Sequence, residues 1–372
     1  MVRLFVCGDV VNFNKELNFV GTDLSNIIKS TDYAICNFEG PELKEGQTVN
    51  CPHQEKGTAS YLSSVGFDLM LLANNHITEL GADGVKHSRA MIKASGAECI
   101  GAGLSWKDAY LPVIKEINGL RFGFVNVCEA QVGQYTSPNQ PFGYAWMGYD
   151  GLFDDVKKLS KETDYVIVFV HAGLEHYDIP IPEIRNLYRG ICDAGASAVI
   201  GGHPHCAQGW EKYKNSLIVY SLGNFYFPLR DMWPQEAHSY SVILGFDVKR
   251  KTVEPVYHYN NGNCVKIDNT GTIDVTNLNE KLGDNYDVLS EIAIQKAYND
   301  ICKRLLIEAT CGQDTNDSLK AVVYKLICYN IKRKKFVKAT EQRRQQLLLR
   351  LFENETYRWT IIRYLKNVNK NY

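Results

Sequence analysis

In the stretch Val199-Ile200-Gly201-Gly202-His203-Pro204-His205, a short apolar run ends in two glycines and a pair of histidines. Four more segments repeat this design, with metal-competent side chains directly after an apolar run. They are Gly8-Asp9-Val10, Asn37-Phe38-Glu39-Gly40-Pro41, Ala73-Asn74-Asn75-His76 and Val170-His171-Ala172-Gly173. In open α/β sheets, binding groups cluster beyond the carboxyl ends of the strands. We therefore expect an α/β sheet with these side chains gathered at one edge.

Residues 1–265 alternate short β-branched runs with helical stretches, the pattern of a layered α/β domain. Expected strands are Arg3–Cys7, Tyr33–Phe38, Leu69–Ala73, Phe122–Val127, Val166–Val170, Ala198–Ile200, Leu217–Ser221 and Ser241–Asp247. Expected helices are Leu24–Lys29, Ala82–Ser95, Tyr149–Lys161 and Glu183–Ala194. Residues 266–281 are rich in Asn, Asp, Gly and Thr and are expected to be a linker. Residues 282–372 show helical spacing of apolar residues and are expected to form an all-α unit.

The composition of the 372-residue chain is that of a globular protein, with 45% hydrophobic and 22% charged residues. A formal net charge of -1 favours neither nucleic acid nor anionic lipid as a partner. The 11 cysteines form no regular framework, which indicates reduced thiols. The first residues resemble no signal peptide, and the longest apolar runs are far below the ~20 residues that cross a bilayer. We expect a cytoplasmic protein without an integral membrane segment.

Carboxylates, a carboxamide and imidazoles together form a mixed oxygen and nitrogen ligand set. Such a set suits Mn, Fe or Zn, whereas calcium prefers oxygen alone. The candidate ligands are Asp9, Glu39, Asn75, His171, His203 and His205. A bridging carboxylate, for which Glu39 is the candidate, can hold two ions ~3.5–4 Å apart and so support an in-line displacement. Such ions lower the pKa of a bound water from 15.7 toward ~7, so no side-chain nucleophile is needed.

The order of these motifs resembles that of the calcineurin-like metallophosphoesterases, and more closely that of the CapA family of poly-γ-glutamate capsule synthesis proteins. The resemblance covers residues 3–228 and includes Leu72-Ala73-Asn74-Asn75-His76, His171-Ala172-Gly173-Leu174-Glu175-His176, Asp193-Ala194-Gly195-Ala196 and Tyr220-Ser221-Leu222-Gly223-Asn224-Phe225. It implies a layered, metallophosphoesterase-like β-sandwich flanked by helices.

The resemblance also implies roles for individual residues. One ion would take Asp9, Glu39 and His205, and the other would take Glu39, Asn75, His171 and His203. His76 matches the catalytic histidine of the superfamily. Ordinary phosphoesterases carry a histidine where this chain has Val11, and an aspartate where it has Glu39. CapA-type proteins share both departures, and the first leaves the site of Asp9 and His205 one imidazole short.

Four further residues are candidates for contacts around the ligands. Glu175 and His176 could orient an imidazole or touch the substrate, because a carboxylate close to a metal-bound histidine often fixes its ring. Asn224 could line the pocket floor or only stabilise its loop. Lys56 could bind an anion or only be solvated. The sequence leaves these alternatives open.

Three functions remain possible. The first is a metal-dependent hydrolase of the CapA branch, with one or two divalent ions, acting on an anionic substrate that carries a γ-glutamyl or phosphate group. The second is a non-catalytic component of polymer synthesis or export that binds polyglutamate. The third is a nucleotidase or phosphodiesterase, which the missing imidazole disfavours. The sequence does not indicate an oligomeric state.

Overall fold

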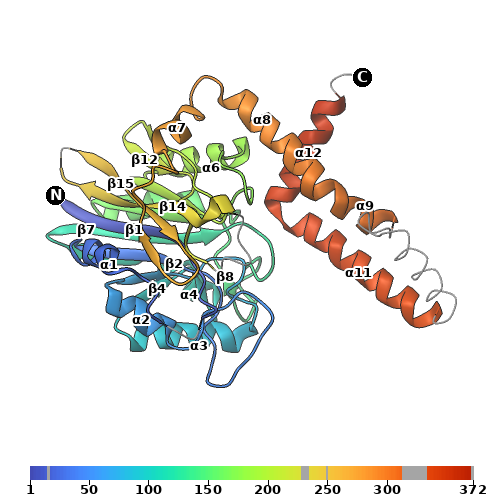
Figure 1. Cartoon of the computed structure of the whole chain (residues 1–372), viewed down its shortest axis with the longest axis horizontal. Helices are drawn as coiled ribbons and strands as arrows, with labels where there is room; N and C mark the ends of the chain where they lie inside the picture. The colour runs from blue at the N-terminus through green and yellow to red at the C-terminus, as the bar shows by residue number, and fades with distance from the viewer. Residues whose placement is uncertain (15–16, 228–233, 249, 312–332, 370–372) are drawn as a thin grey trace. The chain divides into compact units, whose positions relative to one another are not determined.

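The computed structural model describes residues 1–14, 17–227, 234–248, 250–311 and 333–369. The chain divides into two compact units, Met1–Leu289 and Ser290–Tyr372. The first unit holds two large β-sheets and the helices that cover them (Figure 1). All of the residues predicted to bind metal lie in this first unit.

The first sheet has eight strands in the order β16-β15-β14-β1-β2-β3-β4, and β13 also pairs with β1. Their bounds are β1 Val2–Val10, β2 Tyr33–Phe38, β3 Leu69–Leu71, β4 Glu98–Ile100, β13 Asn224–Tyr226, β14 His238–Phe246, β15 Lys251–Asn260 and β16 Val265–Ile267. Strands β1, β2, β3, β4 and β13 run parallel, whereas β14, β15 and β16 add antiparallel pairs at one side. The parallel part therefore directs several carboxyl ends to one edge.

The second sheet has six strands in the order β11-β12-β10-β9-β7-β6. Their bounds are β6 Val113–Ile117, β7 Leu120–Cys128, β9 Tyr165–His171, β10 Ala198–Gly202, β11 Trp210–Tyr213 and β12 Ser216–Val219. Strands β7, β9, β10 and β12 are parallel, and the outer strands β6 and β11 pair antiparallel with their neighbours. A short pair, β5 Ala102–Gly103 and β8 Gly143–Tyr144, stands apart from both sheets.

The two sheets pack face to face, and the alternation of side chains along each strand explains why. Leu4 and Val6 of β1 join Phe124 of β7 and Phe169 of β9 in one core between the sheets. Phe5, between Leu4 and Val6 in sequence, faces the opposite side of the sheet, where a second core lies. One strand therefore contributes to two hydrophobic layers.

Helices cover both outer faces of this sandwich. Those on the first sheet are α1 Thr22–Lys29, α2 Thr58–Val65 and α3 Gly81–Ala94, and those on the second are α5 Leu152–Glu162 and α6 Pro182–Asp193. In Figure 1, α2 and α3 lie below the strands and α6 lies above them. The predicted α/β fold, a layered β-sandwich flanked by helices with a helical C-terminal region, is confirmed.

The boundaries predicted between the parts differ from the division seen in the structure. Residues 266–281, expected to be a linker, contain the end of β16 and helix α7 Val275–Glu280. Asp274 caps α7 by accepting the Thr276 N–H at 2.8 Å, while Val275 and Leu278 pack into the core between the sheets. Only two buried apolar side chains mark this short helix, too few for a helical period to show in the sequence.

The second unit is helical in the residues that the structure describes. Its helices include α9 Lys303–Cys311, α11 Arg333–Glu353 and α12 Glu355–Asn369, and α8 Tyr286–Ala297 crosses the boundary between the units. A small core joins Tyr298, Leu305, Leu351 and Tyr357. Among the described helices of the whole chain, none is long and apolar enough to cross a membrane.

His258 in β15 makes the stability of the first unit depend on pH. Its ring is buried against Phe225, Nε2 lies 3.0 Å from Ser241 Oγ, and burial lowers its pKa to about 3. The unfolded chain takes up this proton near pH ~6.5, so the free energy of unfolding should fall by up to ~1.4 kcal/mol per pH unit below that value, until about pH 3. Urea unfolding between about pH 7 and pH 5 should give a steeper loss for the wild type than for His258→Gln. Equal slopes would contradict the assignment.

Candidate metal centre

The strand ends bring the predicted ligands together from both sheets. Asp9 lies near the end of β1 and is the register partner of Asn37 in β2 and of Asn224 in β13. His171 ends β9 and pairs in register with Gly202, the residue before His203. Asn75 and His76 follow β3 in the same way that Glu39 follows β2 and His205 follows β10. The expected convergence at one edge is therefore seen in the structure.

Asp9, Glu39 and His205 form one group of candidate ligands. Each offers a ligand atom, and these atoms lie within 4.8 Å of one another. Asp9 Oδ2 lies 3.5 Å from His205 Nδ1, and Asp9 Oδ1 accepts a hydrogen bond of 2.7 Å from Asn37 Nδ2. Burial raises the pKa of Asp9, although His205 and Asn37 oppose this shift. Such a buried carboxylate gains from a nearby cation.

His171 lies at the centre of a second group. Its Nε2 atom is 3.1 Å from Asn75 Oδ1, 3.2 Å from His203 Nδ1 and 4.0 Å from Glu39 Oε1. Metal–nitrogen bonds of about 2.0–2.1 Å in a tetrahedral site give ligand-to-ligand separations of about 3.3–3.4 Å. The spacing of these atoms is close to that of ligands around one ion.

Glu39 provides the clearest test of whether this centre fits a metal. Its side chain is completely buried, and neither Oε1 nor Oε2 has a hydrogen-bond partner. Burial, with Asp9 and Glu175 nearby, raises the pKa of Glu39 well above its usual range. A buried carboxylate without donors is costly unless a cation or a proton neutralises it. The residues present therefore fit divalent metal ions.

The buried histidines are held in the form that binds metal. Burial lowers the pKa of His171 well below its usual value and lowers that of His203 to about 3. Both imidazoles are therefore neutral at neutral pH and keep a lone pair for an ion.

The backbone of the two histidines after β10 is also unusual. His203 has a φ of 93°, and His205 has a φ of 60°. Two non-glycine residues in the left-handed region are typical of a backbone held in place for function.

His76 lies at the rim of the centre and not among the ligand atoms. Its side chain is 24% exposed, and its Nε2 atom is 3.9 Å from Glu39 Oε1. On the other side of the ring, Nδ1 lies 3.0 Å from Glu79 Oε1, so a carboxylate orients the imidazole. Nε2 lies 3.2 Å from Asn75 Nδ2 and faces the ligand atoms, so a molecule bound there would exchange a proton with it by replacing this contact.

Three of the four outer residues predicted from the sequence lie close to the centre. Glu175 Oε1 is 3.6 Å from His203 Nε2, and Asn224 Oδ1 is 2.9 Å from His205 Nδ1. His176, whose ring centroid is 6.3 Å from that of His205, binds Glu236. Burial lowers the pKa of His176, but the hydrogen bond to Glu236 and the charges of Glu236 and Glu175 together raise it above its usual value. Lys56 instead forms an exposed ion pair with Glu45, and no described contact joins it to the ligands.

Sequence reasoning missed three residues of the site. Asn37 lies between Asp9 and His171, with Nδ2 3.2 Å from His171 Nδ1. Glu129 is fully buried directly after β7, and Gln131 follows it. Glu129 carries the same signal as the five motifs, since a polar residue follows an apolar strand. No sequence signal marks Gln131.

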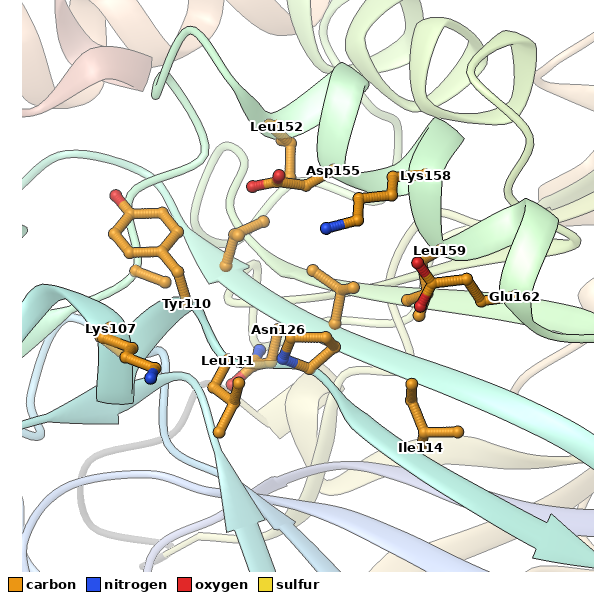
Figure 2. Close-up of a pocket in the computed structure, with 15 residues that line it drawn as sticks. Lys107, Tyr110, Leu111, Ile114, Asn126, Leu152, Asp155, Lys158, Leu159 and Glu162 are labelled. Carbon is orange, nitrogen blue, oxygen red and sulfur yellow. The ribbon is translucent and has the colours of Figure 1, made fainter.

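A separate cavity of about 250 Å³ lies on the outer face of the second sheet, beside α5 and α4 Trp106–Tyr110. Figure 2 shows Asp155 and Lys158 reaching toward it from α5, with Asn126 of β7 below them. Asn126 also lines the small space next to Asp9 and His171. It therefore lies between the cavity and the metal centre.

Replacing Asn126 should destabilise the loop that carries Asn75 and His76. Asn126 is 5% exposed, and its Oδ1 atom accepts the Ala73 N–H at 2.7 Å. Asn126→Leu would leave this buried N–H without a partner, so we expect a loss of about 1–3 kcal/mol in the free energy of unfolding. Urea denaturation measures this loss, with the exposed Asn139→Leu as the control, for which we expect a change within about 0.5 kcal/mol. An equal effect of both changes would argue against the role of Asn126.

Comparison with solved structures gives partial similarity in fold. A hypothetical protein from Thermus thermophilus is 20% identical with a TM-score of 0.47, and the match covers 70% of this chain and 100% of that one. A 5'-nucleotidase precursor from the same organism is 14% identical with a TM-score of 0.43, and the match covers 78% of this chain and 59% of that one.

Comparison with characterised sequences identifies the family. Capsule biosynthesis protein CapA of Bacillus anthracis is 32% identical over 247 residues, which cover 61% of this chain and 60% of the relative. PGA biosynthesis protein CapA of Bacillus subtilis (strain 168) is 27% identical over 207 residues, which cover 54% of each chain. The chain therefore spans only about 54–60% of the length of these relatives. The family described as bacterial capsule synthesis protein PGA_cap matches residues 4–229, a segment that contains every predicted ligand, and the chain belongs to this family.

Proposed function

We propose that this protein is a metal-dependent hydrolase of the CapA type that acts on an anionic substrate with a γ-glutamyl or phosphate group. The observation that carries the proposal is the buried carboxylate of Glu39, which has no hydrogen-bond partner and lies between two groups of ligand atoms. A carboxylate in this position can bridge two ions. A merely structural role would require donors around it, because a buried acceptor without donors is destabilising.

Each residue would have a separate task. Asp9, Glu39 and His205 would hold one ion, and Asn75, His171 and His203 would hold the other together with Glu39. Ions bound there would lower the pKa of a water from 15.7 to about 7 and would stabilise negative charge on the attacked group. His76, oriented by Glu79, would donate a proton to the leaving group or stabilise the developing charge.

The proposed substrate class is supported by the family and by the charge of the site. The relatives carry names that refer to capsule and PGA biosynthesis, which favours a γ-glutamyl compound. Asp9, Glu39, Glu129 and Glu175 all lie close to the ligand atoms, so an anion could approach only when divalent cations offset their charge. Hydrolysis and substrate binding should therefore both depend on metal.

The test is hydrolysis by the purified chain after loading with Mn²⁺ or Zn²⁺, compared with the protein after chelation. The substrates are a γ-glutamyl peptide series and a phosphoester panel. Metal-dependent release of glutamate would support the proposal. Vigorous cleavage of phosphodiesters or nucleotides would favour the nucleotidase alternative, and no turnover with either metal would contradict hydrolysis.

A second candidate function is binding of polyglutamate without hydrolysis. Val11 favours it, because this buried apolar side chain stands where ordinary phosphoesterases place a metal-binding histidine. The ion beside Asp9 and His205 would then be held too weakly for catalysis. Retention of a γ-glutamyl polymer by the metal-loaded protein, without cleavage, would distinguish this function from the first.

A further inference from the structure

We infer that Glu129 and Gln131 fix two ligands of the same ion, Asn75 and His203, and thereby set its affinity. The inference rests on the proposed metal-dependent function. It concerns positioning, because neither Glu129 nor Gln131 is itself assigned as a ligand or as a reacting group. The short segment that carries both residues is called the support segment below and comprises residues 129–131.

The support segment is held firmly to strand β9 and to the pair β5–β8. The Glu129 N–H donates to the His171 carbonyl at 3.1 Å, and the Glu129 carbonyl accepts from the Tyr144 hydroxyl at 3.0 Å. That hydroxyl oxygen in turn accepts the Gln131 N–H at 3.1 Å, and Tyr144 is fully buried. The side chains of Glu129 and Gln131 therefore start from a fixed backbone.

Gln131, together with His76, fixes which way the carboxamide of Asn75 faces, because Asn75 Nδ2 also lies 3.2 Å from His76 Nε2. Asn75 Nδ2 donates to Gln131 Oε1 at 3.1 Å, which leaves Asn75 Oδ1 directed at His171 Nε2, also at 3.1 Å. Only the oxygen of a carboxamide can bind a metal ion, since its nitrogen carries two hydrogens and no free lone pair. Gln131 thus presents the ligand atom of Asn75 to the ion.

Glu129 completes the arrangement around His203. The Nδ1 atom of His203 faces His171 Nε2 at 3.2 Å. On the other side of the ring, His203 Nε2 lies 3.1 Å from the Gln131 amide nitrogen and 3.7 Å from Glu129 Oε1. Gln131 Nε2 also donates to Glu129 Oε1 at 3.0 Å, so Glu129 fixes the amide that contacts His203.

Glu129 is the more deeply buried of the two carboxylates near His203, the other being Glu175, whose Oε1 atom lies 3.6 Å from His203 Nε2. The side chain of Glu129 is completely buried, its Oε2 accepts the Gly173 N–H at 3.1 Å, and its Oε1 accepts from Gln131 Nε2 at 3.0 Å. Glu175, in contrast, has a side chain that is 22% exposed. A carboxylate held from several sides keeps an imidazole in one orientation, and such partners are worth about 10–100-fold in metal affinity.

The experiment measures Mn²⁺ affinity by isothermal titration calorimetry and the melting temperature of the metal-free proteins. Glu129→Gln keeps the shape of the side chain and removes its charge, and Gln131→Met removes the contact to Asn75. Each should weaken the tighter Mn²⁺ site about 10–100-fold. The control Glu42→Gln changes a buried carboxylate that accepts the N–H groups of Gly57 and Ala59, and it should keep wild-type affinity. Glu175→Gln tests the other carboxylate near His203 and should weaken the site less than Glu129→Gln. The metal-free melting temperature shows whether each variant is folded. If Glu129→Gln does not fold, the Mn²⁺ affinity of Gln131→Met alone tests the inference.

Each outcome has one meaning. Weaker Mn²⁺ binding by folded Glu129→Gln or Gln131→Met, with Glu42→Gln unchanged, supports the inference. Wild-type affinity in the folded variants of the support segment, or a loss in Glu175→Gln alone, overturns it. Failure of the wild-type chain itself to bind any divalent ion would instead reject the proposed function.

Discussion

Glu39→Gln is expected to abolish binding of the bridged pair of metal ions and, in metal-free protein, to increase stability. In the absence of an ion, the Glu39 carboxylate is buried without a hydrogen-bond donor, and its pKa is raised well above the usual range. The raised pKa means that this group opposes folding increasingly as the pH rises above about 4.3, until the pKa in the folded state is reached. At neutral pH, the neutral amide should increase the free energy of unfolding by about 1–3 kcal/mol.

The measurement combines Mn²⁺ titration with urea unfolding of chelated protein. Glu42 provides a matched control, because it is also buried but accepts the N–H groups of Gly57 at 3.0 Å and Ala59 at 2.9 Å. Glu42→Gln should therefore destabilise the protein and leave Mn²⁺ binding unchanged. Tight binding by Glu39→Gln, or a loss of stability in its metal-free form, would rule out the bridging role.

His76→Ala is expected to lower kcat for the preferred substrate by about 10²–10⁴-fold, the usual contribution of a general acid or base. Metal content should not change, because Nε2 of His76 is 3.9 Å from Glu39 and the ring is oriented by Glu79 at the rim. The effect is therefore expected in turnover and not in loading. Steady-state kinetics and elemental analysis of the same preparation measure both quantities.

His53→Ala is the control for this change. His53 also lies in a loop of the first unit, but its ring stacks on Phe13 and its Nδ1 atom bonds the Cys51 carbonyl oxygen at 2.7 Å. We expect turnover close to that of the wild type. Loss of metal in His76→Ala would indicate that His76 contributes to metal binding. Unchanged turnover would indicate that His76 takes no part in the reaction.

The sequence predicted the layered fold because the strands that matter are short, apolar and followed by polar residues. Tyr33–Phe38, for example, is predicted and observed with the same bounds. The same junctions located the candidate ligands, since parallel strands that end at one edge deliver their next residues to one place. Strand β15 was missed, because Pro255 argues against a strand in the middle of a sheet.

The parts that escaped prediction depend on contacts between distant segments. Gln131 has no pattern around it, and its importance comes from Asn75 and His203, which belong to different sheets. Lys56 was expected as a possible anion contact, but Glu45, eleven positions earlier, pairs with it at the surface. Such pairings depend on the path of the loops, and the periodicity of apolar residues in one sequence does not predict that path.

The central place of β1 has a consequence for biosynthesis. This first strand lies between β2 and β14 and also pairs with β13. Strands β13 and β14 are synthesised more than 200 residues after β1 and therefore leave the ribosome long after it. Such long-range pairing slows folding and leaves a strand edge open to wrong partners. A nascent chain that stops before Asn224 would lack the β13 partner of Asp9, so the metal centre would be among the last parts of the domain to be completed.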